Sequence, residues 1–217
     1  KILVHGDYDT DGLMGTAVMV GGLTALGASV AAFIPSRFDD GYGLSSASIE
    51  AARKENAKLV VTVDCGSNAG DIEQALSCNG VDLVVSDHHI PEENNLVSGI
   101  IVNPHFGPDQ DLKSLAGATV GYLLLRETAS EMGVSLPEEP FLRLCAIATI
   151  SDVVPISPFN WKLCKEGFRT LAGTRSPGLN ALLEKCPQPP FRSHHIAYYL
   201  APRLNAAGRM EDGNLVL

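Results

Sequence analysis

Four short apolar runs in this chain each end in aspartate or histidine, and this repeated pattern constrains the fold more than any other feature. In three of the runs β-branched residues dominate, which is typical of buried strands. Residues 2–4 precede His5, Asp7, Asp9 and Asp11, and residues 59–63 precede Asp64. Residues 83–85 precede Asp87, His88 and His89, and residues 146–150 precede Asp152. An open parallel sheet binds its ligands at the carboxyl ends of its strands, so we expect these side chains to converge.

Converging carboxylates repel one another unless a cation neutralises them. Oxygen and imidazole ligands suit divalent ions such as Mn²⁺. The pattern therefore predicts a divalent-metal site at one edge of a sheet.

Strand-like and helix-like segments alternate over residues 1–112. We expect strands at 2–4, 30–34, 59–63, 83–85 and 99–102, and helices at 13–26, 45–55 and 69–78. Residues 113–217 carry helical patterns, at 115–132, 138–150, 161–171, 179–184 and 193–200, separated by prolines. The expected fold is therefore α/β, a mostly parallel β-sheet with flanking helices followed by a helix-rich segment.

Composition fits a globular, intracellular protein. The 217 residues are 45% hydrophobic, and the five cysteines form no C-x-x-C pair, which favours reduced thiols and a cytoplasmic location. No apolar stretch reaches the roughly 18–20 residues that a membrane span needs, so no membrane partner is expected. There is no initiating Met, and residues 212–217 stop as if another element followed, so we expect a fragment of a longer protein.

Charge is unevenly distributed along the chain. The net charge is −9, yet residues 161–217 carry eight Lys or Arg against four acids, a balance of +4 that leaves −13 for residues 1–160. This asymmetry permits a polyanion contact beside an acidic centre.

Each motif also has a plainer interpretation. His5-x-x-x-Asp9-x-Asp11 fits a helix cap near Gly12 as well as a metal loop, and Asp64 fits an ordinary strand-end cap. A surface loop before Pro91 is the alternative for Asp87-His88-His89, although two histidines after an aspartate at a strand end favour metal.

The basic motifs are equally open. Arg203 to Arg209 fits either a phosphate contact or a helix end with a glycine stop. Arg37 with Gly41-Tyr42-Gly43 fits a substrate loop or a turn-rich connection, and His194-His195 fits a surface pair.

Taken together, the motifs resemble the DHH phosphoesterase superfamily and, more narrowly, the RecJ-type single-strand-specific 5′→3′ exonucleases. The resemblance rests on His5-Gly6-Asp7-Tyr8-Asp9-Thr10-Asp11-Gly12, Val63-Asp64-Cys65-Gly66, Ser86-Asp87-His88-His89 and Ile150-Ser151-Asp152-Val153-Val154-Pro155. Ile34-Pro35-Ser36-Arg37, Gly41-Tyr42-Gly43 and Arg203-Leu204-Asn205-Ala206-Ala207-Gly208-Arg209 carry the narrower resemblance. Residues 1–112 would then form the metal-binding half of a DHH domain. Residues 113–217 would complete it and lead to a C-terminal domain that this chain lacks, as it lacks an OB-fold.

The resemblance implies a two-metal centre with Mn²⁺ or Mg²⁺. His5 and Asp9 would bind one ion, Asp11, His88 and Asp152 the other, and Asp64 both. Asp7 would be an auxiliary ligand, Asp87 would orient the histidines, and His89 would face the scissile phosphate, so that Asp7, Asp64, His88 and His89 take part in catalysis. Arg37, Asn205 and Arg209 would contact the substrate.

The implied function is metal-dependent 5′→3′ hydrolysis of single-stranded DNA to 5′-mononucleotides. Expected partners are single-stranded DNA and a single-strand-binding protein or helicase. Two alternatives stay open: a phosphodiesterase for short oligonucleotides or cyclic dinucleotides, and a non-catalytic module of a replication complex.

Overall fold

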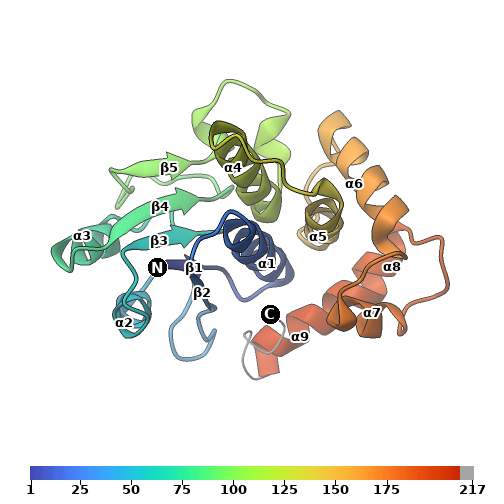
Figure 1. The fold of residues 1–217 in the computed structure, drawn as a ribbon, viewed down its shortest axis with the longest axis horizontal. Coiled ribbons are helices and arrows are strands. Elements are labelled where there is room, and N and C mark those ends of the chain that lie inside the picture. The colour runs from blue at the N-terminus through green and yellow to red at the C-terminus, as the bar shows by residue number, and fades with distance from the viewer. Residues whose placement is uncertain (211–217) are drawn as a thin grey trace.

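A five-stranded, wholly parallel sheet forms the centre of the N-terminal half (Figure 1). The structure is a computed structural model that describes residues 1–210, apart from the side chains of Ala207, Arg209 and Met210. The strands lie in the order β2-β1-β3-β4-β5. Their bounds are β1 (Ile2–His5), β2 (Val30–Phe33), β3 (Leu59–Thr62), β4 (Asp82–Ser86) and β5 (Ile100–Val102). The predicted α/β class and parallel sheet are confirmed.

Helices cover both faces of the sheet. Along β1 and β3, alternate residues point to opposite faces, as the two-residue period of a strand requires. Leu3 and Val60 pack in the core beneath α2 (Ser46–Lys54) and α3 (Gly70–Cys78). Val4 and Val61 pack on the other face, against α1 (Thr10–Ala25) and α4 (Gly117–Glu131).

The remaining helices extend this second layer away from the sheet (Figure 1). They are α5 (Glu138–Ser151), α6 (Pro158–Leu171), α7 (Pro177–Leu183), α8 (Ser193–His195) and α9 (Ala201–Met210), with a π-helical segment, η3 (Ile196–Leu200), between the last two. Short 3-10 turns, η1 (Pro104–Phe106) and η2 (Leu112–Ser114), connect β5 to α4. Within residues 1–210 no helix is long and apolar enough to cross a lipid bilayer.

Several predicted boundaries were wrong, and capping explains most of them. Helix α1 begins at Thr10 and not at residue 13, because the Asp9 side chain accepts a hydrogen bond from Gly12 N and caps the helix. Ser157 likewise caps α6 three residues earlier than predicted. The expected helix over 193–200 is interrupted by the π-helical segment.

Gly208 does not stop a helix, as one interpretation of the basic motif expected. Helix α9 continues through it to Met210. A Cβ at Gly208 would lie 2.3 Å from the Tyr8 carbonyl oxygen, so this glycine lets α9 pack directly on the loop after β1.

Candidate metal centre

Seven acidic and histidine side chains from four separate segments meet beyond the carboxyl ends of β1, β3 and β4. Three groups of ligand atoms each lie within 4.8 Å of one another. They are Asp7, Asp9 and Asp64, then Asp11, His88 and Asp152, and finally Asp64, His88 and His89. Asp64 and His88 each belong to two groups, so the three sets form one continuous centre.

Asp64 lies in the middle of this centre in a strained backbone conformation. Its φ is 64°, a left-handed value that is uncommon for residues other than glycine. The side chain is 2% exposed, and the Asp64 backbone N–H donates to Ser86 O at 3.0 Å. Such strain persists where the surroundings fix it and is concentrated at functional sites. The alternative that Asp64 is an ordinary helix cap has no support, because α3 has no side-chain cap.

The N-terminus of α4 holds the Asp11 carboxylate. Gly117 N donates to Asp11 Oδ2 at 2.6 Å, and Ala118 N donates to Oδ1 at 2.7 Å. These N–H groups have no partner inside the helix, and the helix dipole favours negative charge there. Gly117 is also needed for space, because a Cβ on it would lie 2.4 Å from Asp64 Oδ1.

Four buried polar atoms in the centre have no hydrogen-bond partner among the described residues: His5 Nε2, Asp7 Oδ1, Asp64 Oδ1 and His88 Nε2. His88 Nε2 lies 3.0 Å from Asp64 Oδ1, 3.7 Å from Asp152 Oδ2 and 3.8 Å from Asp11 Oδ2. The 3.0 Å contact between His88 Nε2 and Asp64 Oδ1 does not have the angles of a hydrogen bond, so neither atom has a hydrogen-bond partner among the described residues. Unpaired buried polar atoms are costly and rare, and all four are metal-ligand types.

The pKa values of the carboxyl groups in the centre also fit a metal site. Burial, together with neighbouring carboxylates, raises the pKa of Asp7 to about 7, of Asp11 to about 8 and of Asp152 to about 6. Burial and the Asp11 charge raise the pKa of Asp64 well above its ordinary value. These raised pKa values result from burial and from the crowding of negative charge, and a divalent cation would offset both.

Both candidate histidine ligands are held neutral. Burial lowers the pKa of His5 to about 4, and burial with the adjacent His89 lowers that of His88 to about 4. A neutral imidazole keeps the lone pair that coordinates a metal. His5 lies outside the three groups of ligand atoms, but it is fully buried, and its Nδ1 lies 3.7 Å from Cys65 Sγ.

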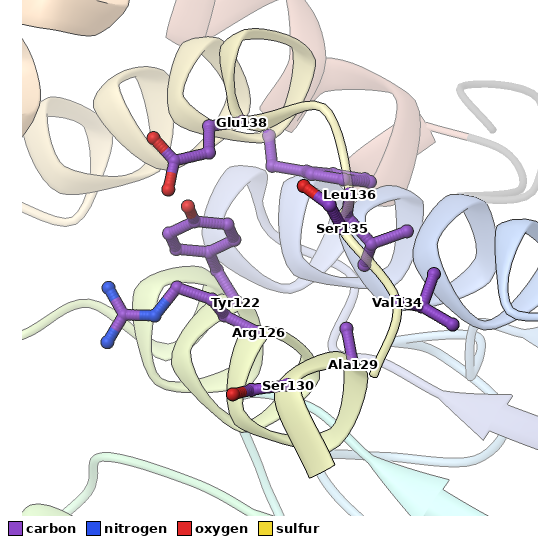
Figure 2. Close-up of a pocket in the computed structure, with 9 residues that line it drawn as sticks. Tyr122, Arg126, Ala129, Ser130, Val134, Ser135, Leu136 and Glu138 are labelled. Carbon is purple, nitrogen blue, oxygen red and sulfur yellow. The ribbon is translucent and has the colours of Figure 1, made fainter. Parts of the chain in front are cut away.

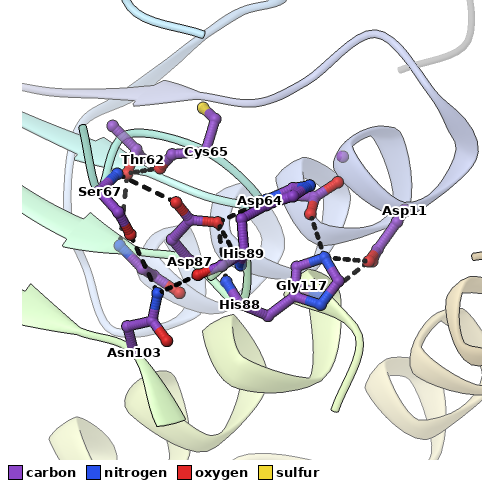
Figure 3. A network of polar contacts seen from close by, with 12 residues as sticks. Asp11, Thr62, Asp64, Cys65, Ser67, Asp87, His88, His89, Asn103 and Gly117 are labelled. Atoms are coloured by element: carbon purple, nitrogen blue, oxygen red, sulfur yellow. Dashed lines mark hydrogen bonds and ion pairs between the residues drawn. The ribbon is translucent and has the colours of Figure 1, made fainter. Parts of the chain in front are cut away.

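Asp87 orients the loop that carries both histidines (Figure 3). Its carboxylate accepts from Ser67 N at 3.0 Å, His88 N at 2.7 Å and His89 Nδ1 at 2.8 Å. Burial opposes ionisation of Asp87, but the hydrogen bonds from His89 and Ser67 outweigh it and lower the pKa of the carboxyl below its usual range. The same hydrogen bond raises the pKa of His89, whose side chain is 48% exposed.

Two residues that sequence reasoning did not assign to the site support this loop. The Tyr42 hydroxyl lies 3.1 Å from His89 Nδ1 and donates to Asp64 O at 3.4 Å. Asn103 Nδ2 donates to His89 O at 2.9 Å and to Ser67 Oγ at 3.0 Å. The Gly41-Tyr42-Gly43 motif could have indicated Tyr42, since both glycines have positive φ. Asn103 only follows a short strand and gave no signal.

The three residues predicted to contact the substrate are Arg37, Asn205 and Arg209. Arg37 stacks over the Tyr8 ring, with its Cζ 5.5 Å from the ring centroid. Asn205 Oδ1 accepts from Thr10 N at 2.8 Å and from Thr10 Oγ1 at 2.7 Å, so it holds the first residue of α1, between Asp9 and Asp11. The side chain of Arg209 lies outside the described residues.

A cavity of about 200 Å³ between α4 and α5 contains none of these side chains. Figure 2 shows the Tyr122 ring and the Glu138 carboxylate facing each other at its edge, with Arg126 beside them. It lies at the start of α5, whereas Asp152 follows the end of that helix. The cavity is therefore separate from the acidic centre.

Comparison with known proteins agrees with this geometry. Residues 1–149 match the DHH family, N-terminal domain. The chain is 39% identical over 218 residues to the single-stranded-DNA-specific exonuclease RecJ of Thermus thermophilus, covering 100% of this chain and 32% of that protein. It is 38% identical to the Escherichia coli protein of the same name, covering 98% of this chain and 39% of that protein. The chain thus spans about a third of the length of these relatives.

Solved structures agree as well. An exonuclease RecJ bound to manganese has a TM-score of 0.90 and 38% identity, covering 99% of this chain and 55% of that one. A Thermus thermophilus RecJ in complex with Mg²⁺ has a TM-score of 0.73 and 34% identity, covering 99% of this chain and 27% of that one. With the family match extending over two thirds of its residues, this chain belongs to the DHH family.

Proposed function

We propose that this chain carries the active centre of a divalent-metal-dependent exonuclease that hydrolyses single-stranded DNA from its 5′ end to 5′-mononucleotides. The observation that carries the proposal is the convergence of Asp7, Asp64 and His88, each with an unpaired buried ligand atom, in one centre. The relatives named as single-stranded-DNA-specific exonucleases, and the manganese and magnesium in their structures, support both substrate class and metal.

The ligand groups suggest how two ions would be held. Asp7, Asp9 and Asp64 would bind one ion, and the resemblance adds to it the buried His5, whose Nε2 is unpaired. Asp11, His88 and Asp152 would bind the other, with Asp64 shared. These residues would hold two ions in a position to supply charge stabilisation and an activated water for phosphodiester hydrolysis.

The protein's own groups supply positioning and charge. Asp87 and Tyr42 fix the His89 ring, and the hydrogen bond that His89 donates to Asp87 favours the protonated form of His89. A cationic, half-exposed His89 beside the centre can donate a hydrogen bond to a phosphate oxygen. Arg37, held over Tyr8, offers a second cation for a terminal phosphate.

Two other functions compete with this one. A phosphodiesterase for short oligonucleotides or cyclic dinucleotides would use the same centre, and a non-catalytic replication module would dispense with the ligands. The complete ligand set favours an enzyme over the second alternative. A cytoplasmic location and a single-strand-binding protein or helicase as partner stay predictions, to be checked by fractionation and affinity capture.

The test uses the protein in its natural full length with Mn²⁺ and DNA labelled at either end. We expect mononucleotide release from the 5′ end of single strands, little from duplexes, and a loss of at least about 10²-fold in Asp64→Asn, since even changes behind the ligands cost 10–100-fold. Asp82→Asn, an exposed aspartate at the start of β4, is the matched control. Faster cleavage of dinucleotides than of long strands would favour the first alternative, and absence of any cleavage would favour the second.

A further inference from the structure

A cleft of about 450 Å³ opens beside the acidic centre, between the end of α5 and the helices η3 and α9. Its lining is small and mostly apolar: Ile150, Ser151, Val153, Ala197, Ala201, Pro202, Asn205 and Ala206. Among the side chains that the structure describes, no charged one lines it. This volume falls within the roughly 300–1,000 Å³ of sites that hold small organic groups.

Both walls of the cleft are connected to the candidate metal ligands. On one wall, Ser151 and Val153 flank Asp152 in the chain. On the other, Asn205 accepts two hydrogen bonds from Thr10, which lies between Asp9 and Asp11. A group bound in the cleft would therefore be continuous with a phosphate bound at the centre.

Val153 is the least expected residue of the cleft. Its φ is 58°, a conformation that is a genuine outlier for a β-branched residue, and its side chain is 85% exposed. Val153 directly follows the C-cap Asp152 of α5, where a left-handed residue often ends a helix, but that residue is usually glycine. Strained backbone of this kind is typical of ligand clamps.

The opposite wall has two features that suit a ligand. The π-helical segment η3, which contributes Ala197, belongs to a helix type that is frequent at functional sites. Because Thr10 occupies Asn205 Oδ1, the Asn205 amide N–H groups are available, and they have no partner among the described residues. The cleft thus combines apolar walls with one amide donor.

We propose that this cleft binds a nucleobase of the DNA strand undergoing hydrolysis, with Val153 as its apolar wall. The inference rests on the proposed nuclease function and adds a specificity-determining residue to it. The described walls are apolar and carry no cation, which suits the face of a base better than a phosphate, and contacts with base faces tolerate any sequence.

The test measures binding of a labelled single strand to the natural full-length protein in the Asp64→Asn background, so that the strand is not consumed. Val153→Gly should weaken binding about fivefold, the size expected for losing part of the burial of a valine side chain. Because glycine adopts positive φ readily, the variant should fold, with an unchanged or higher Tm. Val134→Gly, at an exposed valine before the start of α5, is the matched control and should bind as the parent does.

An abasic nucleotide is placed in turn at each of the first four positions of the DNA strand. The position at which it matters identifies the nucleotide whose base occupies the cleft. At one position, Val153→Gly should add nothing to the loss of binding that the abasic substitution already causes. Equal binding by Val153→Gly and its parent would overturn the inference while leaving the nuclease proposal intact. Failure of the parent to bind single strands, with no hydrolysis by the unsubstituted protein, would overturn both.

Discussion

Replacing Asp64 by Asn should stabilise the metal-free chain and abolish its response to metal. Asn keeps the shape of Asp and tolerates the left-handed conformation that Asp64 adopts. Ligand oxygens of Asp7, Asp9 and Asp64 lie within 4.8 Å of one another. At an effective dielectric constant of about 20, each ionised pair at 4.8 Å costs about 3.5 kcal/mol.

Protonation of the cluster already relieves part of this repulsion, since burial and neighbouring charges raise the pKa of Asp64 well above its ordinary value. We therefore expect a net gain of about 1–2 kcal/mol near pH 8 in the metal-free state, or about 2–8 °C in Tm for a chain of this size. Mn²⁺ at a hundred times its dissociation constant should stabilise the parent by about 2.7 kcal/mol, or about 5–10 °C, and the variant hardly at all.

The assay is thermal unfolding followed by circular dichroism, with EDTA or with Mn²⁺. Asp82→Asn is the control and should behave as the parent in both conditions, because Asp82 is exposed at the other end of the sheet. A metal-free Asp64→Asn variant less stable than the parent, or one that keeps the full Mn²⁺ response, would refute the electrostatic reasoning.

Three further predictions follow from the same centre. Metal-free stability should fall as pH rises from about 4 to about 8, because carboxyls with an ordinary pKa of 3.8 and a folded pKa raised to between about 6 and 8 keep a proton in the folded state that the unfolded state has lost. Unfolding at several pH values should show this fall, and Mn²⁺ should remove most of it. Gly117→Ala should weaken Mn²⁺ binding at least about tenfold, as measured by calorimetry, because its Cβ would lie 2.4 Å from Asp64 Oδ1. Gly178→Ala is the control and should leave Mn²⁺ binding unchanged, because the space around Gly178 is open. Tyr42→Phe should lower kcat about tenfold and leave Mn²⁺ affinity unchanged, because it frees the His89 ring without removing a ligand; equal losses in both would contradict this assignment.

The general position of the site could be predicted from sequence, because strand periodicity and parallel topology fix where strand ends lie. Asp64 and His88 come from different strands, yet both follow apolar runs and had to reach the same sheet edge. Asp152 was harder: the apolar run before it is the end of helix α5 and not a strand, so strand topology does not explain its place in the site.

Other features depend on tertiary contacts that no local pattern encodes. The Asn205–Thr10 hydrogen bonds join residues 195 positions apart, and the motif suggested only a substrate contact for Asn205. The sequence predicted a regular helix over 196–200, where the structure has a π-helical turn, and nothing special at Val153, which adopts a left-handed conformation directly after the end of α5.

Anomalous diffraction from crystals of this chain soaked in Mn²⁺ tests the central claim most directly. The account predicts two peaks, one beside Asp7 and Asp9 and one beside Asp11 and Asp152, with Asp64 between them. An absence of manganese from this centre in fully soaked crystals would contradict it.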